Sequence, residues 1–581
     1  MAGAPTQNNV AAFADTHDAA VAAVDLWIKE QYPASERAKQ WQIAQHEFEG
    51  TGWQLPVSEG VSLLIAVDGL FPYSRPKTAI FGPDAPKDAP HVERNLRLCV
   101  AGSGTTTDHL DPVGVVRYFI EDALNLISAI RAGELLEDFR IDFQAYWHRS
   151  STSKLRVQTI VQLEPPTRPL AQAYYNSQLI VADGAEELER WISNFLGKPF
   201  NGVTAPSLLV WLDPLPVPSE YPATVAQLRK FLNLRSPEVD LDQLLPPPGG
   251  NSVIMIAGPT APGKAGSAAF HLRTPSALKV VKGFRPGRAP PAIVGAGISL
   301  DRVMTTQVSA AESRLPTVQQ ASTRDLRVAI IGCGSLGSGV ARLLAQQGVS
   351  NLTLIDPDFL GWENIGRHEL GAQRVGQNKA KALASQLLMQ LPHLESVVGL
   401  GEDWRTLVQK KPELFEQVDV VVSVTGDWAS EAALSDLQCR GLVRCPVVHG
   451  WLERNAVAAH ALALQGKTPC LRCGFGNTGE PDIVAANWWE EDNDPRCAGP
   501  TSPYGALDLA AGQNLVASLA IDIGARLASP PVWRIWTSLT GTLEGAGGFW
   551  SDRFCANVGD PGMGGRLMAG TWSGRALCEC H

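Results

Sequence analysis

Apolar residues recur along this chain with two spacings, and each spacing predicts a kind of element. Between residues 11 and 31 they recur at helical intervals, and a second long helical pattern runs from Val113 to Ile130. Three short apolar runs lie between these helices, at Trp41–Phe48, Val61–Val67 and Lys77–Phe81. Runs of this length predict strands. The front of the chain is therefore expected to fold as an α+β domain.

The middle of the chain, residues 151–324, carries a weaker pattern. Strand-like runs occur at Leu155–Leu163, Ser207–Leu212 and Ser252–Ile256, and a helical pattern lies near Ala185–Leu196. Clusters of proline interrupt these segments and predict turns between them. We expect a bridging α/β domain here.

The pattern changes again at the start of the last segment, residues 325–581. Val328–Ile331, Asn351–Asp356 and Val418–Val424 are short buried-strand patterns, and helical patterns lie between them. Strands that alternate with helices predict a parallel sheet covered on both faces. The sequence thus predicts an α/β domain at residues 325–581. It is the third domain, after the first domain at residues 1–150 and the bridging domain at residues 151–324.

A glycine motif follows the first strand of this third domain. Gly332, Gly334 and Gly337 have the spacing G-x-G-x-x-G between a strand and a helix, and the next strand ends in Asp356. Glycines allow the tight turn and the close approach of a phosphate to the free amides of the helix N-terminus. An acid at the end of the next strand is typical of contact with a ribose hydroxyl. The motif predicts a nucleotide site.

Polar residues farther along argue against a nicotinamide cofactor, whose site needs an apolar slot. Asn364, Arg367 and Lys379 follow within one βαβ unit and could converge on a triphosphate. Asp427 follows a later buried strand, at the edge where open α/β sheets bind ligands. Its carboxylate could hold Mg²⁺. Taken singly, each of these residues could instead belong to a solvated helix face.

Taken together, these residues resemble the adenylating domain of the ThiF/MoeB and ubiquitin-activating superfamily, over about residues 327–527. The resemblance implies a Rossmann-like fold and attack of a C-terminal glycine carboxylate on the α-phosphate of ATP, giving an acyl-adenylate and pyrophosphate. It also implies that ATP and Mg²⁺ are held by Gly332, Gly334, Gly337, Asp356, Asn364, Arg367, Lys379 and Asp427. His368 departs from the family, in which many members have Gln.

The cysteines suggest a metal site. Cys470 and Cys473 form a C-x-x-C pair, and Cys578 and Cys580 form a C-x-C pair near the C-terminus. Two close thiolate pairs can complete a tetrahedral zinc site. The resemblance implies structural Zn²⁺ here, although the family usually has C-x-x-C in the second pair. A redox role for the first pair is the alternative.

A further cysteine lies in the polar loop between these pairs. Cys497 follows Arg496, a cation that would favour the thiolate. In thioester-forming members of the family, a loop cysteine after the zinc knuckle attacks the acyl-adenylate, and Cys497 matches this position. The alternative is an incidental loop cysteine.

The first domain carries a Pro-His pair and a Leu-Cys ending, at His91 and Cys99. The order of helix, meander, prolines, His, Cys and helix over about residues 10–150 resembles divergent bacterial ubiquitin-conjugating domains. The resemblance implies that Cys99 accepts an acyl group. His91 would orient or deprotonate the incoming amine, or stabilise the oxyanion. The oxyanion Asn of conjugating enzymes is missing, and Asn95 cannot be assumed to replace it. A buried, inert Cys99 is the alternative.

Composition and charge exclude some functions. The net charge of −10 over 581 residues argues against nucleic-acid binding, which usually needs a basic face. We find no secretory signal and expect no apolar stretch long enough to span a membrane. We therefore expect a cytoplasmic protein, whose ten cysteines are not paired in disulfides.

As a whole, the chain resembles the bacterial activating–conjugating fusions of CBASS antiphage defence. The resemblance implies a protein carrier with an accessible C-terminus, a cGAS-like nucleotidyltransferase, that is joined to a target amine through Cys497 and then Cys99. It also implies a homodimer. Three alternatives stay open: a sulfur-carrier or peptide-modifying adenylyltransferase whose front domain only binds, a Rossmann oxidoreductase, and a non-enzymatic scaffold.

Overall fold

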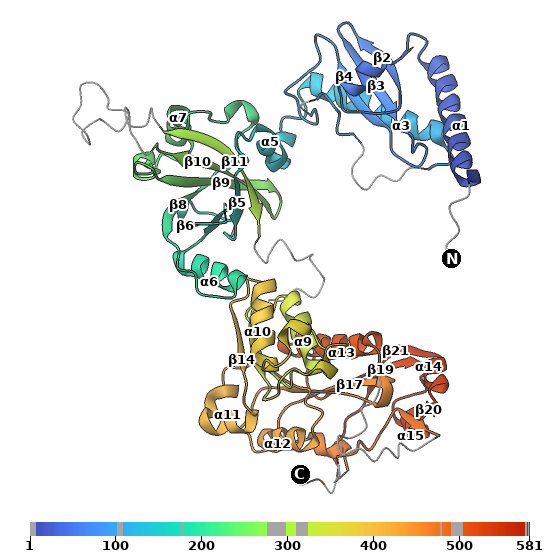
Figure 1. Ribbon diagram of the computed structural model, residues 1–581, viewed down its shortest axis with the longest axis vertical. Helices are drawn as coiled ribbons and strands as arrows, with labels where there is room; N and C mark the ends of the chain where they lie inside the picture. Colours follow the sequence, from blue (N-terminus) through green and yellow to red (C-terminus); the bar gives the residue numbers. More distant parts are fainter. Residues whose placement is uncertain are drawn as a thin grey trace, which may run out of the picture.

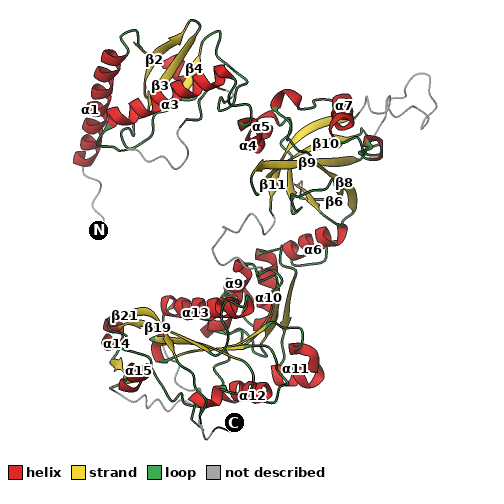
Figure 2. Cartoon of the chain, turned by 180° about the vertical axis from the view of Figure 1, so that it is seen from behind, coloured by secondary structure: helices red, strands yellow, loops and turns green. Residues whose placement is uncertain are grey.

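Three folded units follow one another along the chain, each built on its own sheet (Figures 1 and 2). The computed structural model describes residues 7–93, 95–100, 108–176, 178–275, 298–308, 323–476, 479–489, 504–575, 578 and 580. The sheets are a four-stranded meander, a closed barrel and an eight-stranded sheet, and a two-stranded sheet accompanies the last.

The first unit is an antiparallel meander with two long helices on one face. Its elements are α1 (Gln7–Gln31), β1 (Glu36–Arg37), α2 (Gln40–Ala44), β2 (Thr51–Ser58), β3 (Val61–Val67), β4 (Lys77–Phe81) and α3 (Pro112–Ala132). Side chains that recur at helical spacing, such as Val24 and Ile28 of α1 and Ile120 of α3, pack in one cluster with Leu63 and Ile65 of β3. The predicted helices and the strands β3 and β4 are confirmed.

The predicted strand at Trp41–Phe48 is wrong, because this segment forms α2 and a turn. Its apolar side chains are spaced so that Ile43 and Phe48 cover the second face of the meander, beside Leu64, while Trp41 is exposed. The missing strand is β2, which the sequence analysis did not predict. A short apolar run does not distinguish a strand from a helix that covers a sheet.

The connection to the second unit consists of two short helices, α4 (Asp138–Ile141) and α5 (Phe143–Ser150). Phe143 and Trp147 of α5 are fully buried in the core of the second unit, and the indole of Trp147 donates to the backbone oxygen of Val303 at 2.9 Å. This connection is therefore anchored in the second unit.

The second unit is a closed barrel with the strand order β10-β11-β5-β7-β6-β8-β9. Its elements are β5 (Arg156–Thr159), β6 (Arg168–Tyr175), β7 (Gln178–Ala182), α6 (Ala185–Leu196), β8 (Thr204–Trp211), α7 (Val225–Arg235), β9 (Asn251–Ala261), β10 (Lys264–Arg273) and β11 (Ser299–Gln307). The expected α/β content is confirmed, and each predicted segment overlaps an element. Closure of the sheet removes its edges, and periodicity alone did not predict it.

The third unit is an eight-stranded sheet with the order β14-β13-β12-β15-β16-β17-β19-β21. β14 to β16 pair in parallel, and the last three strands are antiparallel. The strands are β12 (Arg327–Ile331), β13 (Asn351–Ile355), β14 (Ser396–Leu400), β15 (Val420–Ser423), β16 (Val447–Leu452), β17 (Ala458–Leu464), β19 (Val532–Leu539) and β21 (Gly564–Gly570). β18 (Ala486–Trp488) and β20 (Gly548–Trp550) form the two-stranded sheet.

Helices cover both faces of the parallel part, as the continuous apolar strands predict. Alternate residues of β12 point to opposite faces: Ile330 packs with one group of helices, and Ile331 with the other. The helices of the unit are α9 (Ser335–Gln347), α10 (Lys379–Gln390), α11 (Trp404–Lys410), α12 (Trp428–Cys439), α13 (Ala506–Gly524), α14 (Thr540–Gly545) and α15 (Asp552–Asn557).

One helix of the described part of the chain, α13, is long and apolar enough to cross a membrane by length and composition. This corrects the expectation from the sequence. Within the fold, 61% of its apolar window is buried, and Leu515, Val516 and Leu519 pack in the same cluster as α9 and the parallel strands. The helix is apolar because it is a core element of the third unit.

Candidate functional site

The glycine loop between β12 and α9 has the geometry that a phosphate needs. Gly332 has a φ of 90°, a left-handed value that favours glycine. A Cβ at Gly337 would lie 1.9 Å from the backbone oxygen of Gly332, so only glycine allows the helix to start this close to the strand. A Cβ at Gly334 would meet no atom within 4 Å. Gly334 thus borders open space at the N-terminus of α9.

Asp356, at the end of β13, is tied to this loop. Its carboxylate accepts hydrogen bonds from the backbone amides of Cys333, at 2.6 Å, and Asp358, at 2.8 Å. Burial raises the pKa of Asp356, although both amides act in the opposite direction. A carboxylate has about four acceptor positions, so the side chain can still accept from a ribose hydroxyl. Cys333 itself is fully buried.

His368 braces the same loop, a role that the sequence analysis did not assign. Its Nε2 lies 2.7 Å from the backbone oxygen of Cys333, and its Nδ1 accepts from the amide of Leu370 at 3.0 Å. Burial lowers the pKa of His368. The side chain is therefore a neutral imidazole that donates through Nε2 and accepts through Nδ1. No sequence signal pointed to this contact, because Cys333 and His368 come from different loops.

The predicted phosphate-binding residues Asn364, Arg367 and Lys379 each have a partner within the protein. Asn364 accepts a hydrogen bond from the amide of Gly361 at 2.9 Å. The guanidinium of Arg367 lies 4.7 Å from the ring centre of Tyr504. The ammonium of Lys379 lies 3.1 Å from a carboxylate oxygen of Asp358.

Tyr504 is a residue of this site that was not predicted from the sequence. Its hydroxyl lies 2.7 Å from the hydroxyl of Ser335, the first residue of α9. Gln513 of α13 reaches the same place, because its side-chain amide donates to the backbone oxygen of Ser335 at 2.8 Å. Tyr504 and Gln513 thus connect the start of α9 and Arg367 to the segment that leads into α13.

Asp427 lies after β15, as predicted, and caps α12. Its carboxylate oxygens accept from the amides of Ala429 and Ser430, each at 3.2 Å, and the residue is exposed. The four residues after it include a second carboxylate that sequence analysis missed, Glu431. Glu431 is partly buried, with 13% of its side chain exposed, and accepts from Ser423 at 2.8 Å and from His449 at 2.7 Å.

The charge of Glu431 is compensated inside the protein. Burial would raise its pKa, but hydrogen bonds from His449, Thr425 and Ser423 lower it below the ordinary value. Glu431 therefore fixes the β15–α12 turn as a partly buried carboxylate that Ser423 and Thr425 contact. Asp427, the exposed one, is the carboxylate of this turn that could reach a metal ion in solution.

Four cysteines form a cluster that fits zinc. The sulfurs of Cys470, Cys473, Cys578 and Cys580 all lie within 4.8 Å of one another. The Cys470–Cys473, Cys470–Cys578 and Cys473–Cys580 sulfurs are 3.7, 3.5 and 3.4 Å apart. Tetrahedral zinc with Zn–S bonds of about 2.3 Å would place sulfurs about 3.8 Å apart. The two pairs predicted from the sequence thus meet as one site that could hold a metal ion.

Cys497 lies outside the described residues. The described chain resumes at Tyr504, which contacts Arg367 and Ser335 at the glycine loop. Cys497 stays a prediction from the sequence.

In the first unit, Cys99 is exposed and lies opposite His91. The amide of Cys99 donates to the backbone oxygen of His91 at 2.8 Å, and the Cys99 side chain is the largest influence on the pKa of His91. The alternative of a buried Cys99 is therefore wrong. Asn95 does not face Cys99, because its amide donates to the backbone oxygen of His46 at 3.2 Å.

A carboxylate that sequence analysis missed completes this arrangement. Asp138 of α4 lies 2.9 Å from Nε2 of His91. The hydrogen bond with Cys99 and the carboxylate of Asp138 raise the pKa of His91 to about 9, although burial acts against them. His91 is therefore charged at neutral pH in the free protein.

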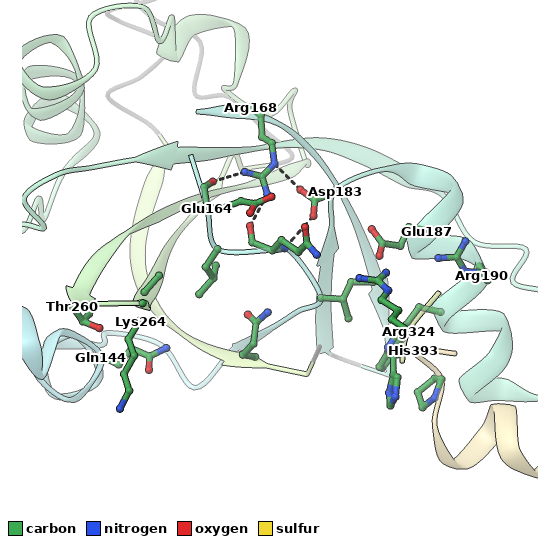
Figure 3. A pocket seen from close by; sticks show the side chains of 18 residues that line it. Gln144, Glu164, Arg168, Asp183, Glu187, Arg190, Thr260, Lys264, Arg324 and His393 are labelled. Carbon is green, nitrogen blue, oxygen red and sulfur yellow. Dashed lines mark hydrogen bonds and ion pairs between the residues drawn. The ribbon is translucent and has the colours of Figure 1, made fainter. Parts of the chain in front are cut away.

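A cavity of about 1090 Å³ lies elsewhere, between the barrel and the third unit, and is lined by polar side chains (Figure 3). One cation of this lining, Arg168, already has partners within the protein. It pairs with Asp183 at 2.7 Å and donates to the backbone oxygens of Glu164 and Gln162. The lining contains none of the predicted site residues.

Comparisons with known proteins agree with both resemblances. Residues 306–508 match the ThiF family, and residues 24–156 match prokaryotic E2 family B. The chain is 24% identical over 419 residues to the ATP-dependent ubiquitin transferase-like protein Cap2 of Pseudomonas aeruginosa, covering 67% of this chain and 71% of that protein.

Other relatives match shorter parts of the chain. The chain is 28% identical over 214 residues to mouse adenylyltransferase and sulfurtransferase MOCS3, covering 34% of this chain and 43% of that protein. Among solved structures, Escherichia coli MccB matches with a TM-score of 0.32 and 19% identity, over 44% of this chain and 67% of that chain.

Proposed function

Because the chain joins a ThiF-family domain to a prokaryotic E2-type domain, we propose that it activates the C-terminal carboxylate of a carrier protein with ATP and transfers it to a target amine. The observation that carries this proposal is an exposed thiol, Cys99, beside a charged imidazole, on the same chain as a preformed phosphate loop. An adenylating enzyme alone does not need the exposed thiol beside an imidazole, and a scaffold needs neither this thiol nor the phosphate loop.

The first step takes place at the glycine loop. The triphosphate lies against the open space at Gly334, with Asn364, Arg367 and Lys379 as phosphate ligands and Asp356 near the ribose. Asp427 would hold Mg²⁺, which neutralises phosphate charge when bound. A carrier carboxylate oxygen attacks the α-phosphorus, the bond to the β-phosphate oxygen breaks, and pyrophosphate leaves.

Two thiols then carry the acyl group. The thiolate of Cys497 attacks the acyl carbon and releases AMP. The thiolate of Cys99 attacks the resulting thioester and returns the electron pair to the sulfur of Cys497. A target amine finally forms an amide and releases Cys99. Cys470, Cys473, Cys578 and Cys580 would hold structural Zn²⁺, which would fix the ends of the two cysteine segments together, and Trp572 donates to the backbone oxygen of Cys470 at 3.0 Å.

The partners follow from the resemblance to CBASS fusions and from the similarity to Cap2. The carrier is a cGAS-like nucleotidyltransferase, the target offers a lysine, and the reaction takes place in the cytoplasm. The enzyme acts as a homodimer, in which Cys497 of one subunit can serve Cys99 of the partner.

A trap at Cys99 tests the relay. A Cys99→Lys variant is expressed in the native host, so that the transferred acyl group forms a stable amide. Mass spectrometry after purification under denaturing conditions is expected to find a protein joined through its C-terminus to position 99. The adduct should vanish in the Cys99→Lys, Cys497→Ala double variant and persist with Cys555→Ala, a matched cysteine control.

A second candidate is an adenylyltransferase that serves a sulfur carrier, favoured by the similarity of part of the chain to adenylyltransferase and sulfurtransferase MOCS3 and to a ThiS adenylyltransferase. It predicts no adduct at position 99 and an acyl-adenylate that forms without Cys99. The absence of the adduct from cells that contain the carrier would overturn the relay.

A further inference from the structure

We propose that Asp138 is a positioning residue for His91, and that its contact with Nε2 directs the imidazole at the acyl group on Cys99 so that His91 stabilises the oxyanion of the transfer step. This inference rests on the proposed function, because it takes Cys99 as the thiol that carries the acyl group. It makes His91 the oxyanion donor in this protein, which lacks the oxyanion Asn of conjugating enzymes.

The backbone places His91 and Cys99 against each other. Val92 and Leu98 form an antiparallel bridge, and the amide of Cys99 donates to the backbone oxygen of His91 at 2.8 Å. His91 has a φ of 60°, in the left-handed region that side-chain-bearing residues rarely adopt. Such a conformation persists where the surroundings hold it.

The surroundings that hold it come from the connection between the first two units. Nε2 of His91 lies 2.9 Å from Asp138 of α4, and its backbone amide donates to the hydroxyl of Tyr146 of α5 at 2.7 Å. Arg149 of α5 donates to the backbone oxygen of Val92. This connection is anchored in the barrel by Trp147. The active site of the first unit is thus completed by residues that lie after its last helix.

The charge on His91 depends on two groups. Cys99 and Asp138 face its imidazole and raise its pKa, whereas Tyr146, with Arg149 over its ring at 5.0 Å, faces its backbone. A thioester sulfur carries no charge, so acylation of Cys99 removes the first contribution. Asp138 then remains as the carboxylate that raises the pKa of His91 against the effect of burial. With Nε2 on Asp138, Nδ1 is the nitrogen available to a second partner.

The charge on the imidazole distinguishes between two roles of His91, which are to deprotonate the amine or to stabilise the oxyanion. A charged imidazole has no lone pair and cannot take the proton of the amine. In the transfer step the amine nitrogen bonds to the acyl carbon, and the carbonyl oxygen becomes negative. A charged N–H donor stabilises this oxygen. The C–S bond then breaks, its electron pair returns to the sulfur of Cys99, and the proton of the amine passes to water.

The test needs no carrier. p-Nitrophenyl acetate acetylates exposed thiols of the full-length protein, and hydroxylamine then removes the acetyl group. The loss of acetyl from the Cys99 peptide is followed by mass spectrometry at about pH 7.5 and about pH 5.5, on either side of the ordinary histidine pKa. Wild type is compared with Asp138→Asn and with Glu137→Gln, a neighbouring carboxylate whose side chain is 72% exposed and pairs with Arg140.

We expect Asp138→Asn to discharge about tenfold more slowly than wild type at the higher pH, less than the loss of an entire oxyanion donor. At the lower pH, where a larger fraction of His91 is protonated in both proteins, the difference between the two rates should become smaller. Glu137→Gln should match wild type at both. Equal rates for Asp138→Asn and wild type at both pH values, or an equal deficit at both, would overturn the proposal.

Asp138→Glu serves as the control for folding, and the Cys99→Lys trap in cells serves as a separate measurement of the proposed function. Asp138→Glu retains the carboxylate and should keep most of the rate at the higher pH, so a slow Asp138→Glu variant also counts against the proposal. Failure of the proposed function is distinguishable, because it appears as an empty trap at Cys99→Lys in cells, whereas acetyl discharge is measured without any carrier.

Discussion

The backbone amide of Cys333 donates a hydrogen bond to the carboxylate of Asp356 at 2.6 Å. This bond joins the glycine loop to the end of the neighbouring parallel strand. His368 holds the carbonyl of the same residue at 2.7 Å, so both backbone groups of Cys333 are fixed. The loop is therefore preorganised, and the amides that meet a phosphate do not have to be ordered when nucleotide binds.

Substitutions at two glycines should separate folding from nucleotide binding. In Gly337→Ala the new Cβ would lie 1.9 Å from the backbone oxygen of Gly332, and we expect a loss of about 1–3 kcal/mol in the free energy of unfolding. In Gly334→Ala the Cβ meets no neighbour within 4 Å, so stability should change by less than about 0.5 kcal/mol, while ATP affinity falls.

Denaturant unfolding and calorimetric titration with ATP measure the two effects. Equal loss of stability in both variants, or ATP binding by Gly334→Ala as in wild type, would contradict this account of the loop.

Arg367 should contribute to nucleotide affinity through its charge. Its guanidinium is oriented by stacking on Tyr504 at 4.7 Å, and a charged hydrogen bond to phosphate is worth about 1.5–3 kcal/mol. Arg367→Ala should therefore weaken ATP binding at least about tenfold, measured by the same titration. Arg374→Ala is the matched control, because Arg374 contacts Gln377 and Met389 rather than the loop.

The cysteine cluster should contain zinc that stabilises the third unit. Purified protein is expected to release zinc on unfolding, and a chelator should lower the thermal midpoint, because bound metal stabilises the folded state. Cys473→Ser should lose the metal. Cys439→Ser should retain it, because Cys439 donates to the backbone oxygen of Lys467 and lies outside the group of four. Metal-free protein with an unchanged midpoint would refute the assignment.

The barrel should lose stability in acid through His271. Burial lowers the pKa of this residue to about 4, and its Nε2 lies 2.9 Å from the hydroxyl of Tyr174. Because the unfolded chain binds the proton more tightly, this contribution is fully present above the ordinary pKa of about 6.5. It is lost as the pH falls toward about 4.

Unfolding followed between these pH values should show a shallower loss in His271→Gln than in wild type. The same pH dependence in both proteins would show that other groups cause the acid sensitivity.

The sequence by itself determined the elements and motifs whose information is local. Gly332, Gly334 and Gly337 stand between a strand and a helix, and the structure has β12 and α9 there. The two cysteine pairs and Cys99 were likewise recognised as candidates, whereas the exposure of Cys99 was decided by the fold. A motif of this kind is encoded by residues close in sequence, and periodicity reports which face of an element is buried.

Only the tertiary structure decided which distant residues meet. Asp138 lies 47 positions from His91, yet it contacts the imidazole at 2.9 Å. His368 reaches Cys333 across 35 positions, and Glu431 meets His449 across 18 positions at 2.7 Å. Such pairings, like closure of the barrel, result from the packing of whole elements. A local pattern cannot encode them, because the same spacing is compatible with many partners.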